Sequence, residues 1–178
     1  MTARLFLILC VLGMASPVLA DATVVVLGIR SLEGDDEFAK DLTEQLRGAA
    51  KTVPGWSVSS AAVSMSQMTL AHGCDDIDAS CLSDIAKGLS VERVIYGTVR
   101  RNSTGTDYDY ALSVSLYDAE AGRIVREVDD TIPQAQIEFN ALAARSDKLM
   151  ARLASNKTGG TIAIHANVAA AAVTVNGQ

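Results

Sequence analysis

Two cysteines, Cys74 and Cys81, constrain this chain more than any other feature. They lie in the segment 72–101, HGCDDIDASCLSDIAKGLSVERVIYGTVRR, beside a predicted helix and the most strand-like run of the sequence. Asp78 or Ser80 can cap that helix, and its apolar positions are Leu82, Ile85, Ala86 and Leu89. A cross-link between the cysteines would therefore fix a loop to the start of a helix.

The cysteine pair can exist as a disulfide, as free thiols or as part of a metal site. The other possible metal ligands nearby are His72, Asp75, Asp76 and Asp78. The spacing is not C-x-x-C, and the acidic run lacks the glycine of a calcium loop. We expect a Cys74–Cys81 disulfide, for which the chain-entropy estimate is roughly 2.5 kcal/mol. We expect no metal and no cofactor.

The first 20 residues predict a signal peptide that is cleaved before Asp21. Arg4 supplies a basic start, residues 5–14 form a short apolar run, and Val18-Leu19-Ala20 ends in a small residue. The apolar run is shorter than a membrane span, and Cys10 lacks the small preceding residue of a lipoprotein signal. The alternative is an uncleaved N-terminal helix. Export predicts a periplasmic or envelope location, which is an oxidising compartment. Removal of the signal peptide leaves two cysteines, an even number, in the mature chain.

The charge of the mature chain argues against two classes of partner. It has 14 basic residues (15 less Arg4) against 21 acidic ones, a net charge of −7. Nucleic acids and anionic membrane surfaces both favour basic patches. We therefore expect neither as a partner, and we expect no transmembrane segment in the mature chain.

The rest of the pattern predicts a mixed sheet with helices packed on it, an α/β or α+β fold of about five strands. The continuous apolar run 23–27, TVVVL, is typical of a central strand in a parallel arrangement. After it we expect a loop at Arg30–Asp36 and a helix that begins at Asp35–Glu37 and buries Phe38, Leu42, Leu46 and Ala49. A strand at 56–58 and a short helix within 63–71, with Met65 and Met68 as core residues, precede the helix capped by Asp78 or Ser80. Strands at 94–99 and 123–132, a turn at 102–105 and a long helix from Pro133 to about Ala154 complete the predicted elements.

The segment 107–118 is the clearest strand. Its apolar positions alternate with polar ones, which predicts an antiparallel strand with one face in water. The two faces are Tyr108, Tyr110, Leu112, Val114 and Leu116, against Asp107, Asp109, Ser113 and Ser115. Tyr108 and Tyr110 could stack a sugar, but we favour core packing. Gly97, in the middle of the preceding strand, predicts a bulge or a close backbone approach.

With these elements placed, residues 21–154 resemble the TolB N-terminal-type domain of exported bacterial envelope proteins. The matching features are the first strand TVVVLGI, the acidic start of the next helix, Cys74 with Cys81-Leu82, the strand 94–99 with Gly97, and Leu112, Val114, Leu116 and Asp118. The resemblance implies that the domain contacts envelope proteins or cell-wall polymer. It brings no catalytic residues.

The C-terminal residues resemble the opening of a PEGA domain. After a polar linker at 155–160, the segment 161–178 carries the matching positions Thr161, Ile162, Ile164, Ala171, Val173, Val175 and Gly177. Val168, Ala170 and Asn176 depart from the pattern. We expect an incomplete PEGA-like β segment with a short hairpin.

The sequence contains no G-x-G-x-x-G, Walker A, H-E-x-x-H or G-x-S-x-G motif. We therefore expect a non-catalytic envelope protein that acts as a protein or cell-wall interaction module. One alternative is a periplasmic protein that binds a small ligand at the mouth of the sheet near Arg30–Asp36. A second alternative is a hydrolase that uses His72.

Overall fold

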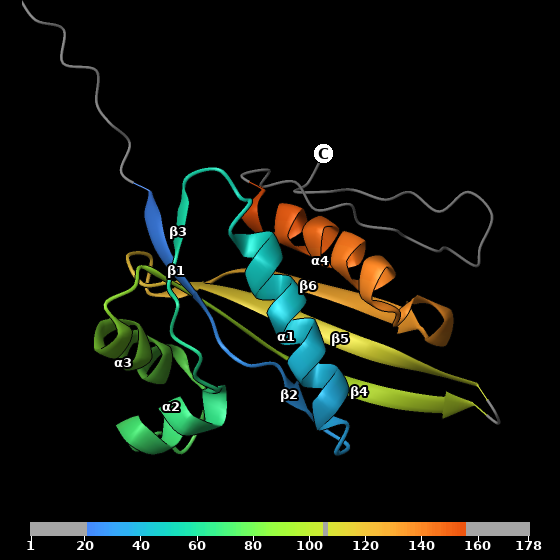
Figure 1. Cartoon of the computed structure of the whole chain (residues 1–178). Helices are drawn as coiled ribbons and strands as arrows, with labels where there is room; N and C mark the ends of the chain where they lie inside the picture. The colour runs from blue at the N-terminus through green and yellow to red at the C-terminus, as the bar shows by residue number, and fades with distance from the viewer. Residues whose placement is uncertain (1–20, 105–106, 156–178) are drawn as a thin grey trace, which may run out of the picture.

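A computed structural model describes residues 21–104 and 107–155, and Figure 1 shows the arrangement of their elements. The predicted signal peptide (1–20) and PEGA-like segment (161–178) lie outside these residues. The elements are β1 (Ala22–Val26), β2 (Arg30–Ser31), α1 (Asp36–Ala50), β3 (Trp56–Val58), α2 (Met65–His72), α3 (Ala79–Leu89), β4 (Arg93–Thr104), β5 (Asp107–Asp118), β6 (Arg123–Pro133), the 3-10 turn η1 (Gln134–Gln136) and α4 (Phe139–Ala154).

The strands form one six-stranded mixed sheet, which confirms the predicted fold class. Its order is β3-β1-β4-β5-β6, and β2 pairs with β4 beyond the end of β1. β1 runs parallel to β3 and β4, as its apolar run predicts, and Val24, Val25 and Val26 are buried. β4, β5 and β6 form an antiparallel meander.

Helices cover the two faces of the sheet to different extents. α1 and α4 share one core with the inward side chains of the sheet, from Trp56 in β3 to Ile132 in β6. Amphipathic spacing accounts for this, because Leu42, Leu46, Leu149 and Leu153 fall on the buried stripes of their helices. α2 and α3 lie on the opposite face and form a smaller core with β1, β4 and β5 (Figure 1).

Burial of β5 confirms one predicted face and corrects the other. Tyr110, Leu112, Val114 and Leu116 lie in the α1/α4 core. The opposite face is in water over only part of its length, because α3 covers its end. There Tyr117 is buried and its hydroxyl donates to the Ala79 carbonyl at 3.2 Å.

Three predicted boundaries were wrong. The loop at Arg30–Asp36 begins with β2, since β4 extends past β1 and offers it an unpaired edge. β4 continues to Thr104, so residues 102–104 of the predicted turn belong to a strand. The last helix begins at Phe139, because Pro133 is still the final residue of β6 and η1 intervenes.

Gly97 confirms the predicted close backbone approach. A Cβ atom there would overlap the carbonyl oxygen of Ser113 in β5, and it would lie 3.1 Å from Ile29 Cδ1. The side-chain-free position lets β4 and β5 pair while Ile29 packs over them.

Candidate functional site

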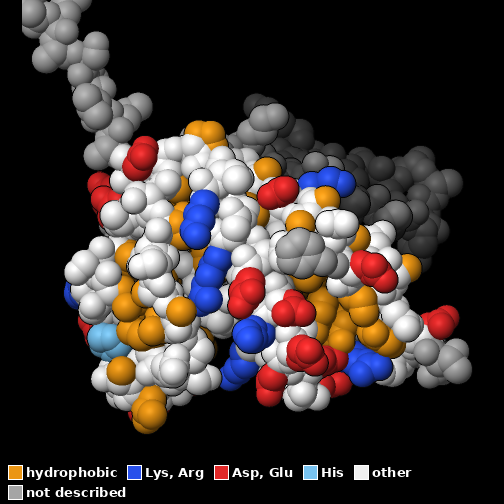
Figure 2. Space-filling model, viewed as in Figure 1, with side chains coloured by type: hydrophobic (Ala, Val, Ile, Leu, Met, Phe, Trp, Pro, Cys, Tyr) orange, Lys and Arg blue, Asp and Glu red, His pale blue; other side chains and the backbone are white. Residues whose placement is uncertain are grey.

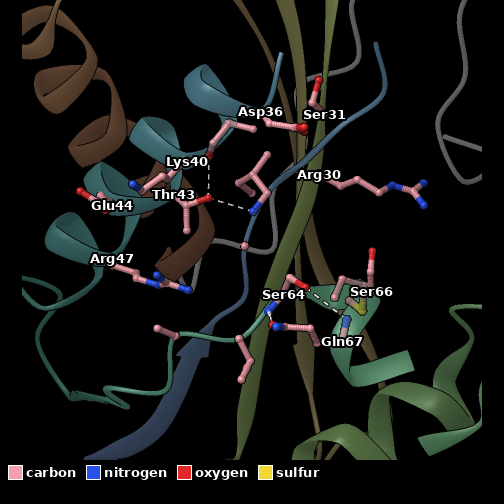
Figure 3. Close-up of a pocket in the computed structure, with 16 residues that line it drawn as sticks. Arg30, Ser31, Asp36, Lys40, Thr43, Glu44, Arg47, Ser64, Ser66 and Gln67 are labelled. Carbon is pink, nitrogen blue, oxygen red and sulfur yellow. Dashed lines mark hydrogen bonds between the residues drawn. The ribbon is translucent and has the colours of Figure 1, made fainter. Parts of the chain in front are cut away.

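A cleft of about 480 Å³ lies where the chain leaves β1 (Figure 3). Three segments of the chain line it: residues 28–31 after β1, one side of α1, and residues 62–67 at the start of α2. Gly28 joins two of them, because its N–H donates to the Val63 carbonyl at 3.0 Å. The cleft therefore exists only once β1, α1 and α2 have assembled.

The topology explains why a cleft forms at this point. From β1 the chain passes through α1 on one face to β3, and then through α2 and α3 on the other face to β4. β3 and β4 flank β1 on opposite sides. The connections thus diverge at the carboxyl end of β1, which is the place where open parallel sheets bind ligands.

α1 supplies a fixed wall of the cleft. Thr43 is buried, accepts the N–H of Ile29 at 2.9 Å and donates to the Ala39 carbonyl at 2.7 Å. One turn later, the Arg47 Nε donates to the Val26 carbonyl at 3.0 Å. These bonds attach α1 to the last residue of β1 and to the segment that follows it, and they hold the Arg47 side chain at the cleft.

The start of α2 supplies the opposite wall. Ser64 caps the helix: its Oγ accepts the N–H of Gln67 at 3.2 Å, and Gln67 Oε1 accepts the N–H of Ser64 at 2.8 Å. This capping box fixes the first turn of α2. Figure 3 shows Ser64, Ser66 and Gln67 facing the α1 side chains across the cleft.

The charged side chains at the cleft are three basic and two acidic ones. Arg30, Lys40 and Arg47 line it, against Asp36 and Glu44. In residues 21–104 and 107–155, none of these five side chains forms an ion pair within 4.0 Å. Figure 2 shows Lys and Arg side chains in a row beside α1 on this face. The cleft has a local charge of +1 (3 − 2), although the whole chain carries −6.

The structure joins Cys74 and Cys81 by a disulfide, with Cα atoms 5.8 Å apart. Cys81 is buried between α2 and α3. Asp78 rather than Ser80 caps α3, because its Oδ1 accepts the N–H of Cys81 at 2.8 Å. The bridge therefore fastens the loop after α2 to the first turn of α3.

His72 lies exposed at the end of α2, next to Gly88 of α3. A Cβ atom on Gly88 would lie 2.7 Å from its Cε1 atom, so the glycine makes room for the imidazole. Within the described part of the chain, His72 has no hydrogen-bond partner, and no three His, Cys, Asp or Glu residues are grouped to hold a metal ion. Asp75 and Asp76 are exposed.

The tyrosine pair on β5 packs as core and not as a sugar platform. Tyr110 is buried, stacks on Phe38 with ring centroids 3.9 Å apart, and donates its hydroxyl to Asp35. Burial, followed by the neighbouring Asp35 carboxylate, raises the pKa of Tyr110. The ring of Tyr108 is covered by the Arg101 guanidinium at 4.0 Å.

The half of the sheet that α2 and α3 leave uncovered forms a second surface. We call it the open half: Thr98, Arg100, Ala111, Ser113, Asp129 and Thr131, on β4, β5 and β6. It is hollowed, with a volume of about 700 Å³. At its inner border, burial raises the pKa of Tyr96, whose hydroxyl lies near Ser115 and Glu127.

Sequence reasoning located the cleft only in part. The segment Arg30–Asp36 contributes Arg30, Ser31 and Asp36, but Lys40, Arg47 and Ser64 were not among the predicted site residues. No local motif marks them. The cleft could have been inferred only from the topology. The strand TVVVL is followed by a helix on one face of the sheet, and the next crossover lies on the other face. For the open half, the polar positions of 107–115 had predicted that one face of this strand lies in water.

No protein-family model and no curated protein matches the sequence. Similar solved structures include the LpoB C-terminal domain from Escherichia coli, with 20% identity over 67% of this chain and 88% of that one, and a TM-score of 0.45. They also include TolB from Acinetobacter baumannii (14% identity, 75% and 28% coverage, TM-score 0.46) and lipoprotein GNA1162 from Neisseria meningitidis (14%, 77% and 99%, 0.48).

No helix in the described ranges has the length and apolar character needed to cross a membrane.

Proposed function

We propose that this chain is a non-catalytic interaction module of the bacterial envelope, which holds a partner protein or cell-wall polymer on the open half of its sheet. The observation that carries the proposal is the uncovered surface itself. Small side chains at Ala111, Ser113 and Thr131 leave the sheet accessible, while the opposite face of the same strands packs against α1 and α4.

The charge pattern of the open half supports a polar partner. Arg100 lies exposed on β4, and Asp129 lies exposed two strands away on β6. Exposed groups of both signs favour orientation of a partner over raw affinity. The predicted signal peptide and the resemblance to the TolB N-terminal-type domain support a partner in the envelope.

Photo-crosslinking tests the proposal. A photoreactive residue is placed at Arg100 on the open half, with Asp41 on the exposed side of α1 as the matched control position, and the protein is expressed with its own export segment. Crosslinks to an envelope protein or to wall polymer from Arg100 but not from Asp41 are expected. Ser113→Arg should abolish them by filling the hollow. If native pull-down retains neither protein nor wall polymer, the proposal fails.

A second candidate function is small-ligand binding, and the cleft at the carboxyl end of β1 favours it. Its position matches the site where open α/β sheets bind ligands, and its volume lies within the usual range for small-molecule sites, about 300–1,000 Å³. A specific ligand should raise the melting temperature by mass action, because it binds only the folded chain.

A further inference from the structure

Three basic side chains come together at the cleft, and their surroundings differ from those of the arginines that form ion pairs. Arg93, Arg101 and Arg145 each pair with an aspartate, at 3.5, 3.9 and 2.7 Å. Arg30, Lys40 and Arg47 line a concavity and form no such pair within the described residues. Asp36 and Glu44 line the same hollow and form no ion pair in the described residues either, so the three cations leave it a small excess of positive charge.

Arg47 is the side chain best placed to contact a ligand. It is half-buried, whereas Arg30 and Lys40 are exposed. Its Nε is engaged by the Val26 carbonyl, which leaves both terminal NH₂ groups without a partner in the described part of the chain. A guanidinium held by one bond loses less entropy on binding, and its remaining fork matches the two oxygens of a carboxylate or phosphate.

Neutral donors face these cations. The capping box occupies Ser64 Oγ and Gln67 Oε1 as acceptors, so the Ser64 hydroxyl and the Gln67 amide NH₂ stay able to donate. The first turn of α2 adds the partial positive charge of a helix start. This contribution supplements the arginine and does not define the site.

We propose that the cleft binds a small oxyanion ligand, with Arg47 as its principal contact and with Lys40 and Arg30 supplying attraction. The proposal rests on the second candidate function, small-ligand binding. Two kinds of ligand share this chemistry, those bearing a phosphate and those bearing a carboxylate. The volume of about 480 Å³ accommodates a sugar-sized molecule beside the anionic group.

The experiment titrates the exported protein at fixed ionic strength with four probes: inorganic phosphate, glucose 6-phosphate, glucuronate and neutral glucose. Calorimetry gives the affinity, and backbone amide shifts of Gly28 and Ser66 report binding in the cleft. One charged class should bind and shift these amides, while glucose should not. Fixed ionic strength removes general screening as an explanation.

Three variants identify the contact. Arg47→Gln should weaken binding about tenfold or more, since a bidentate charge-assisted contact is lost. Lys40→Gln should weaken it by a smaller factor, and because Lys40 is exposed this variant remains informative if Arg47→Gln folds poorly. Arg123→Gln removes the same charge from an exposed site at the β5–β6 turn and should leave the affinity unchanged.

Phosphate-bearing or carboxylate-bearing probes that bind equally well to wild type and to both cleft variants would overturn the proposal. If only glucose binds in the cleft, the oxyanion proposal fails while small-ligand binding stands. If no probe shifts Gly28 or Ser66, the oxyanion proposal is overturned, and a wider thermal-shift screen then decides the second candidate function separately.

Discussion

The face of the sheet beneath α1 and α4 is buried from β3 to β6, whereas α2 and α3 cover only the half of the other face next to β1. The two layers are also fastened by different means. An ion pair between Arg145 and Asp130 ties α4 to β6, and a disulfide ties the α2–α3 connection together. Because the covered face holds the larger core, we expect it to provide most of the stability, while the other face keeps polar surface available.

The largest expected effect is a cavity in the covered face. Leu46→Ala should lower the free energy of unfolding by about 4 kcal/mol, because the side chain is fully buried between α1 and the sheet and its removal leaves a cavity. Met68→Ala, in the smaller core, should cost about 2 kcal/mol. Urea unfolding of both variants gives the comparison. Equal losses would contradict the idea that the two helical layers contribute differently to the free energy of unfolding.

A backbone substitution tests the sheet that both faces share. Gly97→Ala should cost about 3 kcal/mol, because the added methyl group would overlap the β5 backbone at Ser113. Gly48→Ala in α1 is the matched control: a Cβ atom there meets nothing within 4 Å, so the variant should gain about 0.5 kcal/mol from helix propensity. Thermal unfolding measures both. A neutral Gly97→Ala would show that β4 and β5 can separate without loss.

Removal of the disulfide tests the layer formed by α2 and α3. Replacing Cys74 and Cys81 together by serine should lower stability by roughly 2 kcal/mol, since a short loop is released in the unfolded chain. Additional local opening should be confined to α2 and α3, so amide exchange should quicken most there, whereas core amides of α1 should quicken by no more than the global loss. Thiol titration of the denatured, unreduced protein should detect no free thiol. Two reactive thiols would contradict the bridge and lead to a measurement of bound zinc.

Local patterns predicted the covered face well. Each buried residue predicted for α1, from Phe38 to Ala49, follows from helical periodicity and is buried in the structure. Alternation in β5 likewise predicted the side that meets α1 and α4. These features depend on one segment at a time, and tertiary packing did not override them.

The cleft and the open half were harder to predict because they depend on how segments meet. Arg47 reaches the Val26 carbonyl across 21 sequence positions, and no motif encodes that contact. Ser115 looks like a surface residue by alternation, yet it is buried. The polar positions of β5 do not show which part of its outer face α3 covers. The covered part depends on the length of the crossover that contains α2 and α3.

The smallest expected effect concerns the ion pair that fastens α4. Arg145 Nε lies 2.7 Å from Asp130 Oδ2, and its Nη2 lies 2.9 Å from Oδ1. Hydrogen bonding from Arg145 holds the pKa of Asp130 below its usual value, despite partial burial. Asp130→Asn should therefore cost about 1 kcal/mol at neutral pH. Asp129→Asn, its exposed neighbour on the open half, should cost less than about 0.5 kcal/mol.

The stability contribution of the Arg145–Asp130 pair should depend on pH in a definite direction. The folded-state pKa of Asp130 is lowered, so the folded chain binds fewer protons than the unfolded chain, and the contribution of the pair is complete above the ordinary aspartate pKa of about 4. It is lost as the pH falls through the lowered folded-state value. The stability difference between wild type and Asp130→Asn should thus stay constant from neutral pH to about 4 and shrink below it. Urea unfolding across that range measures the difference. A gap that persists undiminished in acid would mean that packing, and not charge, fastens α4 to β6.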